Sequence, residues 1–167
     1  CCVIVNGPGM VMRIGRSVDR DQWLMTTPTV NAYYSAQLNE IVFPAGRLQP
    51  PFFSASYDEA ANYGGIGATV GHEMSHGFDD AGRQYDASGN VRDWWAPEDA
   101  RHYRARASVV ERQYSAYVAI DTMHLNGRLT LGENIADVVG VSLAYEALER
   151  SLKEKSRDPI DGFTPEQ

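Results

Sequence analysis

One short stretch of the sequence, His72-Glu73-Met74-Ser75-His76, has the pattern HExxH. Histidines four residues apart lie one above the other on a helix face, where the two imidazoles can share one zinc ion. The glutamate between them points partly toward the same cleft and can take a proton from a metal-bound water. The motif therefore predicts one Zn²⁺ per chain and hydrolytic chemistry. A purely structural role is the weaker interpretation, because a structural helix would not need two stacked imidazoles on a face of small residues.

A hydrolytic zinc site takes a third protein ligand, and the histidines elsewhere in the chain are poor candidates for it. The extended motif HExxHxxGxxH would need glycine and histidine where this chain has Asp79 and Gly82. His102 lies in a charged helical segment and His124 in a polar loop, so both are predicted to be solvated surface residues. The third ligand is therefore sought among the carboxylates.

Glu133 and Asp137 are four residues apart and share one face of a predicted helix with Gly140 and Ala144. A carboxylate pair among small residues fits a helix that presses against the zinc helix. In that interpretation Glu133 binds the metal and Asp137 accepts a hydrogen bond from a ligand imidazole. An ordinary acidic face near a helix N-terminus explains the same pattern equally well. The pattern alone leaves both interpretations open.

The elements that must position these residues are mainly helical. Two short runs rich in β-branched and aromatic residues predict a hairpin or two neighbouring strands, a Pro- and Gly-rich run predicts a loop, and amphipathic runs predict helices. The expected elements are strands over 29–34 and 40–43, a loop over 44–51, helices over 59–80, 97–118 and 130–155, and a turn over 86–90.

Within the helix that carries the motif, the large apolar residues predict the face that packs in the core. These residues are Tyr63, Ile66, Val70, Met74 and Phe78. The glycines of the same helix, which cost helix stability, indicate that other backbone passes close by.

Composition narrows the function classes. Apolar residues make up 43% of the 167 residues and charged residues 22%, which is typical of a globular domain. The net charge of −7 repels phosphate backbones and disfavours nucleic acid as a partner. No run approaches the length of a membrane span, and the adjacent Cys1 and Cys2 predict no internal disulfide framework. The helix-start pattern of residues 164–167 predicts that the natural chain continues.

Several segments together resemble the catalytic domain of the neprilysin-type metallopeptidases, zinc endopeptidases of the gluzincin group. The resemblance runs from about residue 15 to residue 167. The matching segments are VNAYY at 30–34, IVFPAGRLQPPFF at 41–53, NYGGIGATVGHEMSHGFDD at 62–80, DWW at 93–95, GENIAD at 132–137 and IDGFTPEQ at 160–167.

The resemblance implies an α+β, predominantly helical fold, a thermolysin-like zinc peptidase core with a small β-hairpin or edge strand. It implies zinc bound by His72, His76 and Glu133, with Glu73 as catalytic base and with Asp137 orienting a ligand histidine, most plainly His72. Asp79 would be a further acid near the second histidine.

The resemblance also implies substrate-binding residues. Asn31 and Ala32 would grip the extended peptide along an edge strand. Arg47, Phe52 and Thr69, with Ala68, would line the pocket for the residue after the cut bond. Arg47 and Thr69 are more polar than the family's usual lining, so a strict preference for large apolar side chains is not carried over.

The resemblance implies that residues 1–167 form part of a peptidase catalytic domain. The family's oxyanion-stabilising histidine and substrate-binding arginine lie beyond the matching segments, and its helical lobe precedes them. The expected function is zinc-dependent endopeptidase activity on oligopeptides, working with the remainder of the peptidase chain in an extracellular, periplasmic or membrane-anchored setting. The alternatives are an inactive zinc-holding fragment or pseudoenzyme that only binds peptides, and a helical interaction module with an accidental motif.

Overall fold

A computed structural model of the chain describes residues 19–155, 158–164 and 166. The fold is mainly helical with two small antiparallel strand pairs, which confirms the predicted class. The helices are α1 (Glu59–Asn62), η2 (Tyr63–Gly67), α2 (Ala68–Ser75), η3 (His76–Phe78), η4 (Gly82–Gln84), α3 (Pro97–Ala116), α4 (Leu131–Ser151) and η5 (Leu152–Glu154). The strands are β1 (Tyr33–Ser35), β2 (Glu40–Val42), β3 (Val118–Ile120) and β4 (Met123–His124). Cys1 and Cys2, and Pro165 and Gln167 of the predicted helix start, lie outside the described residues.

The motif lies on an unbroken helical run from α1 to η3, close to the predicted span. The carboxylate of Asp58 caps its start by accepting a hydrogen bond from the backbone N–H of Ala61 at 2.8 Å. A π turn, η2, interrupts the α-helical repeat at a position rich in glycine. A Cβ on Gly65 of this turn would lie 2.4 Å from the carbonyl oxygen of Phe52. The glycine therefore lets the preceding loop pass directly against the helix.

The helical run ends at Phe78 rather than at the predicted Asp80. Asp79 has extended backbone with ψ −174°, and its carboxylate accepts hydrogen bonds from the backbone N–H groups of Ala81 and Gly82 at 2.8 and 2.6 Å. This local bonding replaces a further helical turn and fixes the side chain of Asp79 beside the helix end.

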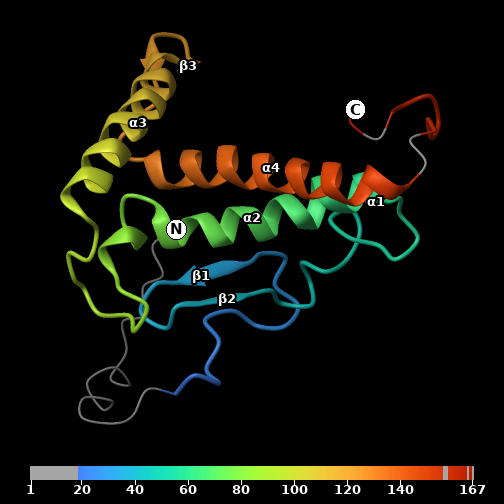
Figure 1. Cartoon of the computed structure of the whole chain (residues 1–167), viewed down its shortest axis with the longest axis horizontal. Coiled ribbons are helices and arrows are strands. Elements are labelled where there is room, and N and C mark those ends of the chain that lie inside the picture. Colours follow the sequence, from blue (N-terminus) through green and yellow to red (C-terminus); the bar gives the residue numbers. More distant parts are fainter. Residues whose placement is uncertain (1–18, 156–157, 165, 167) are drawn as a thin grey trace.

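Helices α2 and α4 lie side by side, and the β1–β2 hairpin lies along the other side of α2 (Figure 1). The two helices touch backbone to backbone at Gly71 and Gly140. A Cβ on Gly71 would lie 2.7 Å from the Gly140 carbonyl oxygen, and one on Gly140 would lie 2.6 Å from the His72 nitrogen. Ala136 and Ala144 of α4 are buried beside this contact. The predicted approach of a small-residue face of α4 to the motif helix is therefore present.

The prediction that the large apolar residues of the motif helix face the core is wrong for its C-terminal half. Val70, Met74 and Phe78 are 37%, 52% and 58% exposed, and Tyr63 and Ile66 are half-buried. The residues of α2 that are buried are Thr69, Gly71, Glu73 and Ser75. Gly71 lets α4 approach closely, and the larger apolar side chains remain outside this contact.

The hairpin is confirmed, with Tyr33 opposite Val42 in an antiparallel register. Its first strand is shorter than predicted, because residues 29–32 precede β1 and pair with no strand among the described residues. A run of β-branched residues forms a strand only where a neighbouring strand completes its hydrogen bonds. Asn31 and Ala32 therefore lead into the hairpin rather than belonging to it.

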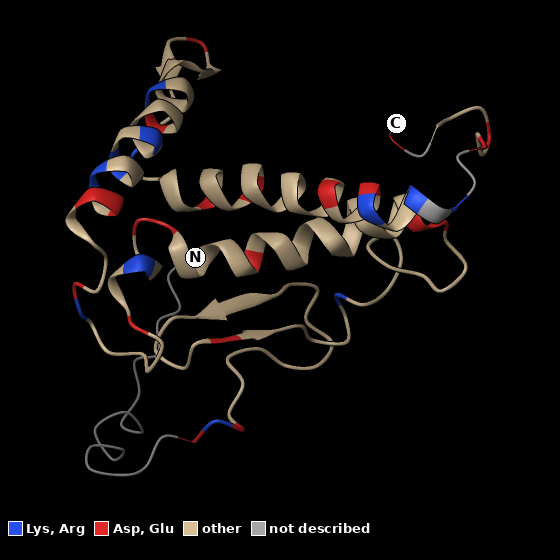
Figure 2. Cartoon of the chain, viewed as in Figure 1, with Lys and Arg blue, Asp and Glu red and all other residues tan. Residues whose placement is uncertain are grey.

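Helix α3 begins at the predicted Pro97 and ends at Ala116, two residues early, since Val118 joins the strand pair β3–β4. Charged residues gather along α3 and are sparse on α2 and the hairpin (Figure 2). Among the described residues, no helix combines the length and the apolar character needed to cross a bilayer.

Candidate metal centre

The two histidines of the motif lie with their rings edge to face, 4.7 Å between centroids, and with their Nε2 atoms 3.0 Å apart. Each Nδ1 lies against a carboxylate: Nδ1 of His72 is 2.8 Å from Oδ1 of Asp137, and Nδ1 of His76 is 2.7 Å from Oδ2 of Asp79. A carboxylate only accepts hydrogen bonds, so both Nδ1 atoms carry protons. In the neutral tautomers the two Nε2 lone pairs therefore face each other, as in a site that binds a cation between them.

Glu133 of α4 supplies a third donor atom at the same point. Its Oε2 lies 3.4 Å from Nε2 of His72 and 3.8 Å from Nε2 of His76. A tetrahedral zinc ion with ligand bonds of about 2.0–2.1 Å holds its ligand atoms about 3.3 Å apart. The three separations of 3.0, 3.4 and 3.8 Å bracket this value, so two imidazole nitrogens and one carboxylate oxygen fit zinc.

Glu73 lies next to this donor set and differs from Glu133 in its surroundings. Glu73 is 5% exposed and its carboxylate lies within 4.8 Å of the histidine donor atoms, whereas the Glu133 side chain is 69% exposed. Burial raises the pKa of the Glu73 carboxyl, and the neighbouring His72, His76 and Arg47 only partly oppose that rise. A buried carboxyl with a raised pKa is suited to accept and release a proton.

The pair formed by His76 and Asp79 is charge-stabilised. The hydrogen bond that Nδ1 of His76 donates to Asp79 raises the pKa of His76, although burial of the ring acts in the other direction. Burial alone would raise the pKa of Asp79, but hydrogen bonds from His76, Gly82 and Ala81 outweigh it and lower that pKa. Asp79 therefore stays ionised and holds the ring of His76 in one orientation.

A cavity of about 450 Å³ adjoins the donor set. The predicted pocket residues Arg47, Phe52 and Thr69 line it together with Asn31. Within it, Nη2 of Arg47 donates a hydrogen bond to Oγ1 of Thr69 at 2.8 Å, and its guanidinium carbon lies 3.7 Å from the centre of the Phe52 ring. Ala32 is buried beside Asn31 and does not line the cavity.

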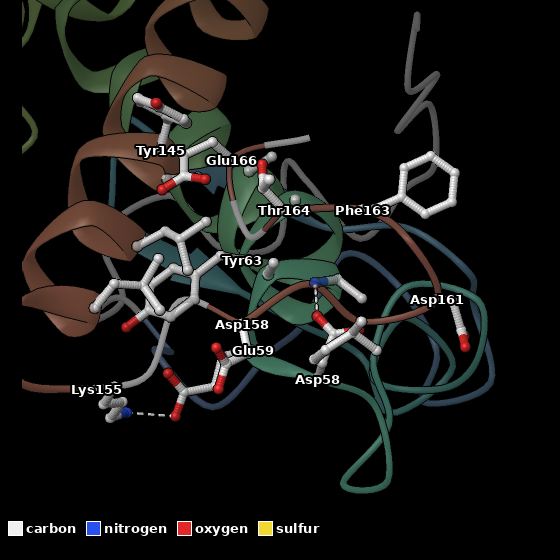
Figure 3. A pocket seen from close by; sticks show the side chains of 18 of the residues that line it. Asp58, Glu59, Tyr63, Tyr145, Lys155, Asp158, Asp161, Phe163, Thr164 and Glu166 are labelled. Atoms are coloured by element: carbon white, nitrogen blue, oxygen red, sulfur yellow. Dashed lines mark hydrogen bonds and ion pairs between the residues drawn. The ribbon is translucent and has the colours of Figure 1, made fainter.

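A larger cavity of about 770 Å³ lies at the other end of α4 and contains none of the donor residues. Figure 3 shows its lining, with Tyr63 and Tyr145 among the labelled side chains and with the ion pair of Lys155 and Glu59 at its edge. The two cavities share Gly64, Ala68 and Val141 as lining residues. His72 and Glu133 of the donor set, together with Glu73, therefore line the smaller cavity.

The structure brings together most of the predicted site residues, from four parts of the chain. His72, Glu73 and His76 come from the motif helix, Glu133 and Asp137 from α4, Asn31 from the segment before β1, and Arg47 and Phe52 from the loop after β2. His102 and His124 are exposed, as predicted, and contact Glu98 and the Ser115 carbonyl. Gly65 and Val141 of the lining were not predicted, because small and apolar residues carry no distinctive pattern.

Comparison with known proteins agrees with this geometry. The profile of peptidase family M13 matches residues 31–167. The chain is 46% identical over 158 residues to mouse endothelin-converting enzyme 1, covering 93% of this chain and 20% of that protein. It is 47% identical over 148 residues to neprilysin-2 of Caenorhabditis elegans, covering 88% of this chain and 20% of that protein. The chain thus spans about a fifth of the length of these curated relatives.

Solved structures give the same result. The inhibitor complex of the Mycobacterium tuberculosis zinc metalloprotease ZMP1 superposes with a TM-score of 0.85 at 51% identity, covering 89% of this chain and 23% of that chain. PEPO from Lactobacillus rhamnosis superposes with a TM-score of 0.75 at 43% identity, covering 78% of this chain and 21% of that chain. The chain therefore belongs to peptidase family M13, the neprilysin family of zinc metallopeptidases.

Proposed function

We propose that this chain carries the catalytic centre of a zinc-dependent endopeptidase that hydrolyses peptide bonds in oligopeptides. The observation that carries the proposal is the convergence of three donor atoms, from His72, His76 and Glu133, beside the buried Glu73. These three residues would hold one Zn²⁺. When bound, zinc acidifies water and polarises a carbonyl group.

In this proposal the residues of the chain have separate tasks. Glu73 takes the proton of the attacking water and passes it to the leaving amine, for which its raised pKa is suited. Asp137 and Asp79 hold the Nδ1 protons of the two histidines, so that each Nε2 lone pair points to the metal. Both carboxylates are positioning residues rather than catalytic ones.

The substrate would lie across the smaller cavity. Asn31 and Ala32, which lead into the hairpin, would bind the extended peptide backbone. Arg47, Phe52 and Thr69 would receive the side chain of the residue after the cut bond. Family membership favours an enzyme that works outside the cytoplasm, together with the rest of its peptidase chain.

The test compares the zinc content and peptide hydrolysis of the full-length protein with those of a Glu73→Gln variant. We expect about one zinc per chain in both proteins and a loss of kcat of about 10²- to 10⁴-fold in the variant. Glu98→Gln, which changes an exposed glutamate of α3, is the matched control and keeps full activity.

Three outcomes would contradict the proposal in different ways. A folded protein without zinc would exclude the metal centre. Unchanged hydrolysis by Glu73→Gln would exclude Glu73 as the base. Zinc binding and peptide binding without any hydrolysis would favour the alternative of an inactive protein that only binds peptides.

A further inference from the structure

The cavity beside the donor set is lined by a positively charged side chain, that of Arg47, which has no task in the proposed reaction. Arg47 is the only lysine or arginine among the described residues that line it. We infer that Arg47 makes this pocket select a carboxylate side chain, Asp or Glu, in the residue that follows the cut bond. The inference rests on the proposed function and adds a substrate class to it.

The guanidinium of Arg47 is held in place by neutral groups. Its Nη2 donates to Oγ1 of Thr69, and the Thr69 hydroxyl donates in turn to the carbonyl oxygen of Gly65 at 3.2 Å. The guanidinium also lies over the ring of Phe52, which is itself in backbone contact with Gly65. Because the motif helix and its neighbouring loop fix these partners, Arg47 is a preorganised group rather than a mobile surface side chain.

The charge of Arg47 has no carboxylate partner in the part of the chain that the structure describes: no acidic group lies within 4.0 Å of it. A guanidinium has five N–H donors, of which the bond to Thr69 uses one, and the buried Nε has no hydrogen-bond partner. Because Nε is enclosed, the donors left for a ligand are the three other N–H groups of the two Nη atoms. A half-buried cation with such donors is matched best by a carboxylate, which accepts two parallel hydrogen bonds from it.

An apolar substrate side chain fits this pocket less well. One face of the Phe52 ring is covered by the guanidinium. An apolar group placed there would remove Arg47 from water without giving it a hydrogen bond, which is unfavourable for a charge. A carboxylate avoids this desolvation cost.

The acidic residues of the cavity do not cancel this preference. Glu133 and Asp137 contact His72, at the end of the cavity where zinc would be bound. Glu73 is also there; burial raises its pKa, and Arg47 is among the groups that partly oppose that rise. A rival role for Arg47, in which it only tunes Glu73, would affect every substrate equally, and this difference decides the test.

The experiment uses the zinc-loaded full-length enzyme and peptides blocked at both ends that differ only after the cut bond, where they have Glu, Gln or Leu. We expect kcat/KM for the Glu peptide to exceed that for the Gln peptide about tenfold or more. In Arg47→Met the ratio falls to about one and the Leu peptide improves, while Arg47→Lys retains part of the preference. Arg101→Met, on the exposed face of α3, keeps the wild-type ratio. Added salt reduces the preference, since the guanidinium is partly exposed.

Two further arms separate the explanations. A peptide that ends at the Gln residue with a free carboxylate tests whether the pocket binds a chain terminus instead; a preference for this peptide over the Glu peptide would overturn the inference. The dissociation constants of the Glu and Gln peptides, measured with zinc-loaded Glu73→Gln, test the pocket without turnover, and we expect the Glu peptide to bind about tenfold more tightly.

The results also distinguish this inference from the proposed function. An enzyme that cleaves no peptide contradicts the proposed function, while the dissociation constants still decide the role of Arg47. An enzyme that cleaves the Leu peptide best, with a Glu to Gln ratio near one, contradicts the inference alone. If kcat/KM falls equally for all peptides in Arg47→Met, Arg47 acts only on the pKa of Glu73, and the inference is overturned as well.

Discussion

His72 and His76 are four residues apart on one helix, yet one is hydrogen-bonded to a carboxylate close by in the sequence and the other to a carboxylate on a different helix. His76 is held by Asp79, three residues further along the chain, whose side chain is 8% exposed and also binds two backbone N–H groups. His72 is held by Asp137 of α4, whose side chain is 68% exposed. One support is local and buried, and the other is tertiary and open to solvent.

The difference shows how the candidate metal centre is assembled. The His76 half forms wherever the end of the motif helix forms, because all its groups lie between residues 76 and 82. The His72 half, together with Glu133, exists only when α4 packs on α2 at Gly71 and Gly140. The two halves can therefore be disturbed separately.

The strongest disturbance is Gly140→Val, which removes the His72 half. The new Cβ would lie 2.6 Å from the backbone nitrogen of His72, and neither backbone can move without separating the helices. We expect a loss of about 1–3 kcal/mol in the free energy of unfolding. Zinc affinity should fall by more than the hundredfold typical for one lost supporting hydrogen bond. Urea unfolding and chelator competition measure the two effects.

Gly64→Ala is the control for this change, because a Cβ at Gly64 meets no atom within 4 Å. Equal effects of the two substitutions would show that the α2–α4 contact does not govern the site.

Asp79→Ala comes next and removes the local support. Zinc affinity should fall about 10- to 100-fold. Because the backbone N–H groups of Ala81 and Gly82 lose their acceptor, unfolding should also become about 1–3 kcal/mol easier. Asp80→Ala removes the same charge from the next residue and should leave zinc affinity unchanged; if it matches Asp79→Ala, the effect is one of net charge.

Asp137→Ala should lower zinc affinity by a similar factor, about 10- to 100-fold, with little loss of stability. Its carboxylate is exposed and has His72 as its partner, so the free energy of unfolding should change by less than about 0.5 kcal/mol. Asp137→Asn, which keeps an acceptor oxygen, should recover part of the affinity. A stability loss as large as that of Asp79→Ala would remove the contrast between the two supports.

The smallest expected effect is a pH dependence of the metal-free protein. The raised pKa of His76 gives stability that is present below its ordinary value of 6.5 and is lost as the pH rises through the raised value. The lowered pKa of Asp79 gives stability that is present above 3.8 and is lost as the pH falls through the lowered value. Both contributions are therefore present between these ordinary values. Urea unfolding measured from below this range to above it should show a maximum of stability within it that flattens in Asp79→Asn, and an unchanged profile would contradict the pairing.

The parts of the site that follow from local geometry could be predicted from the sequence. The spacing of His72 and His76 places both rings on one helix face, and the spacing of Glu133 and Asp137 does the same on α4. Neither spacing says that the two faces meet. The glycines of the motif helix predicted that other backbone passes close by, but the sequence did not show that Gly71 would contact Gly140 of α4.

The errors have the same origin. Helical periodicity groups Val70, Met74 and Phe78 on one face but does not say which face another helix covers, and the structure leaves these residues exposed. The contact of Arg47 with Thr69 could not be predicted either, because Arg47 lies in a loop without any repeat.

The backbone contact between Gly71 and Gly140 also fixes the position of α4 along its own axis relative to α2. Glu133 and Asp137 lie seven and three residues before Gly140 on the same rigid helix. Since a helix rises about 1.5 Å per residue, a slip by a single residue would carry both carboxylates about 1.5 Å along the imidazoles. Metal–ligand distances tolerate only about 0.2 Å. The positions of the ligand atoms therefore depend on the absence of a Cβ at Gly71 and at Gly140 as much as on any charged side chain.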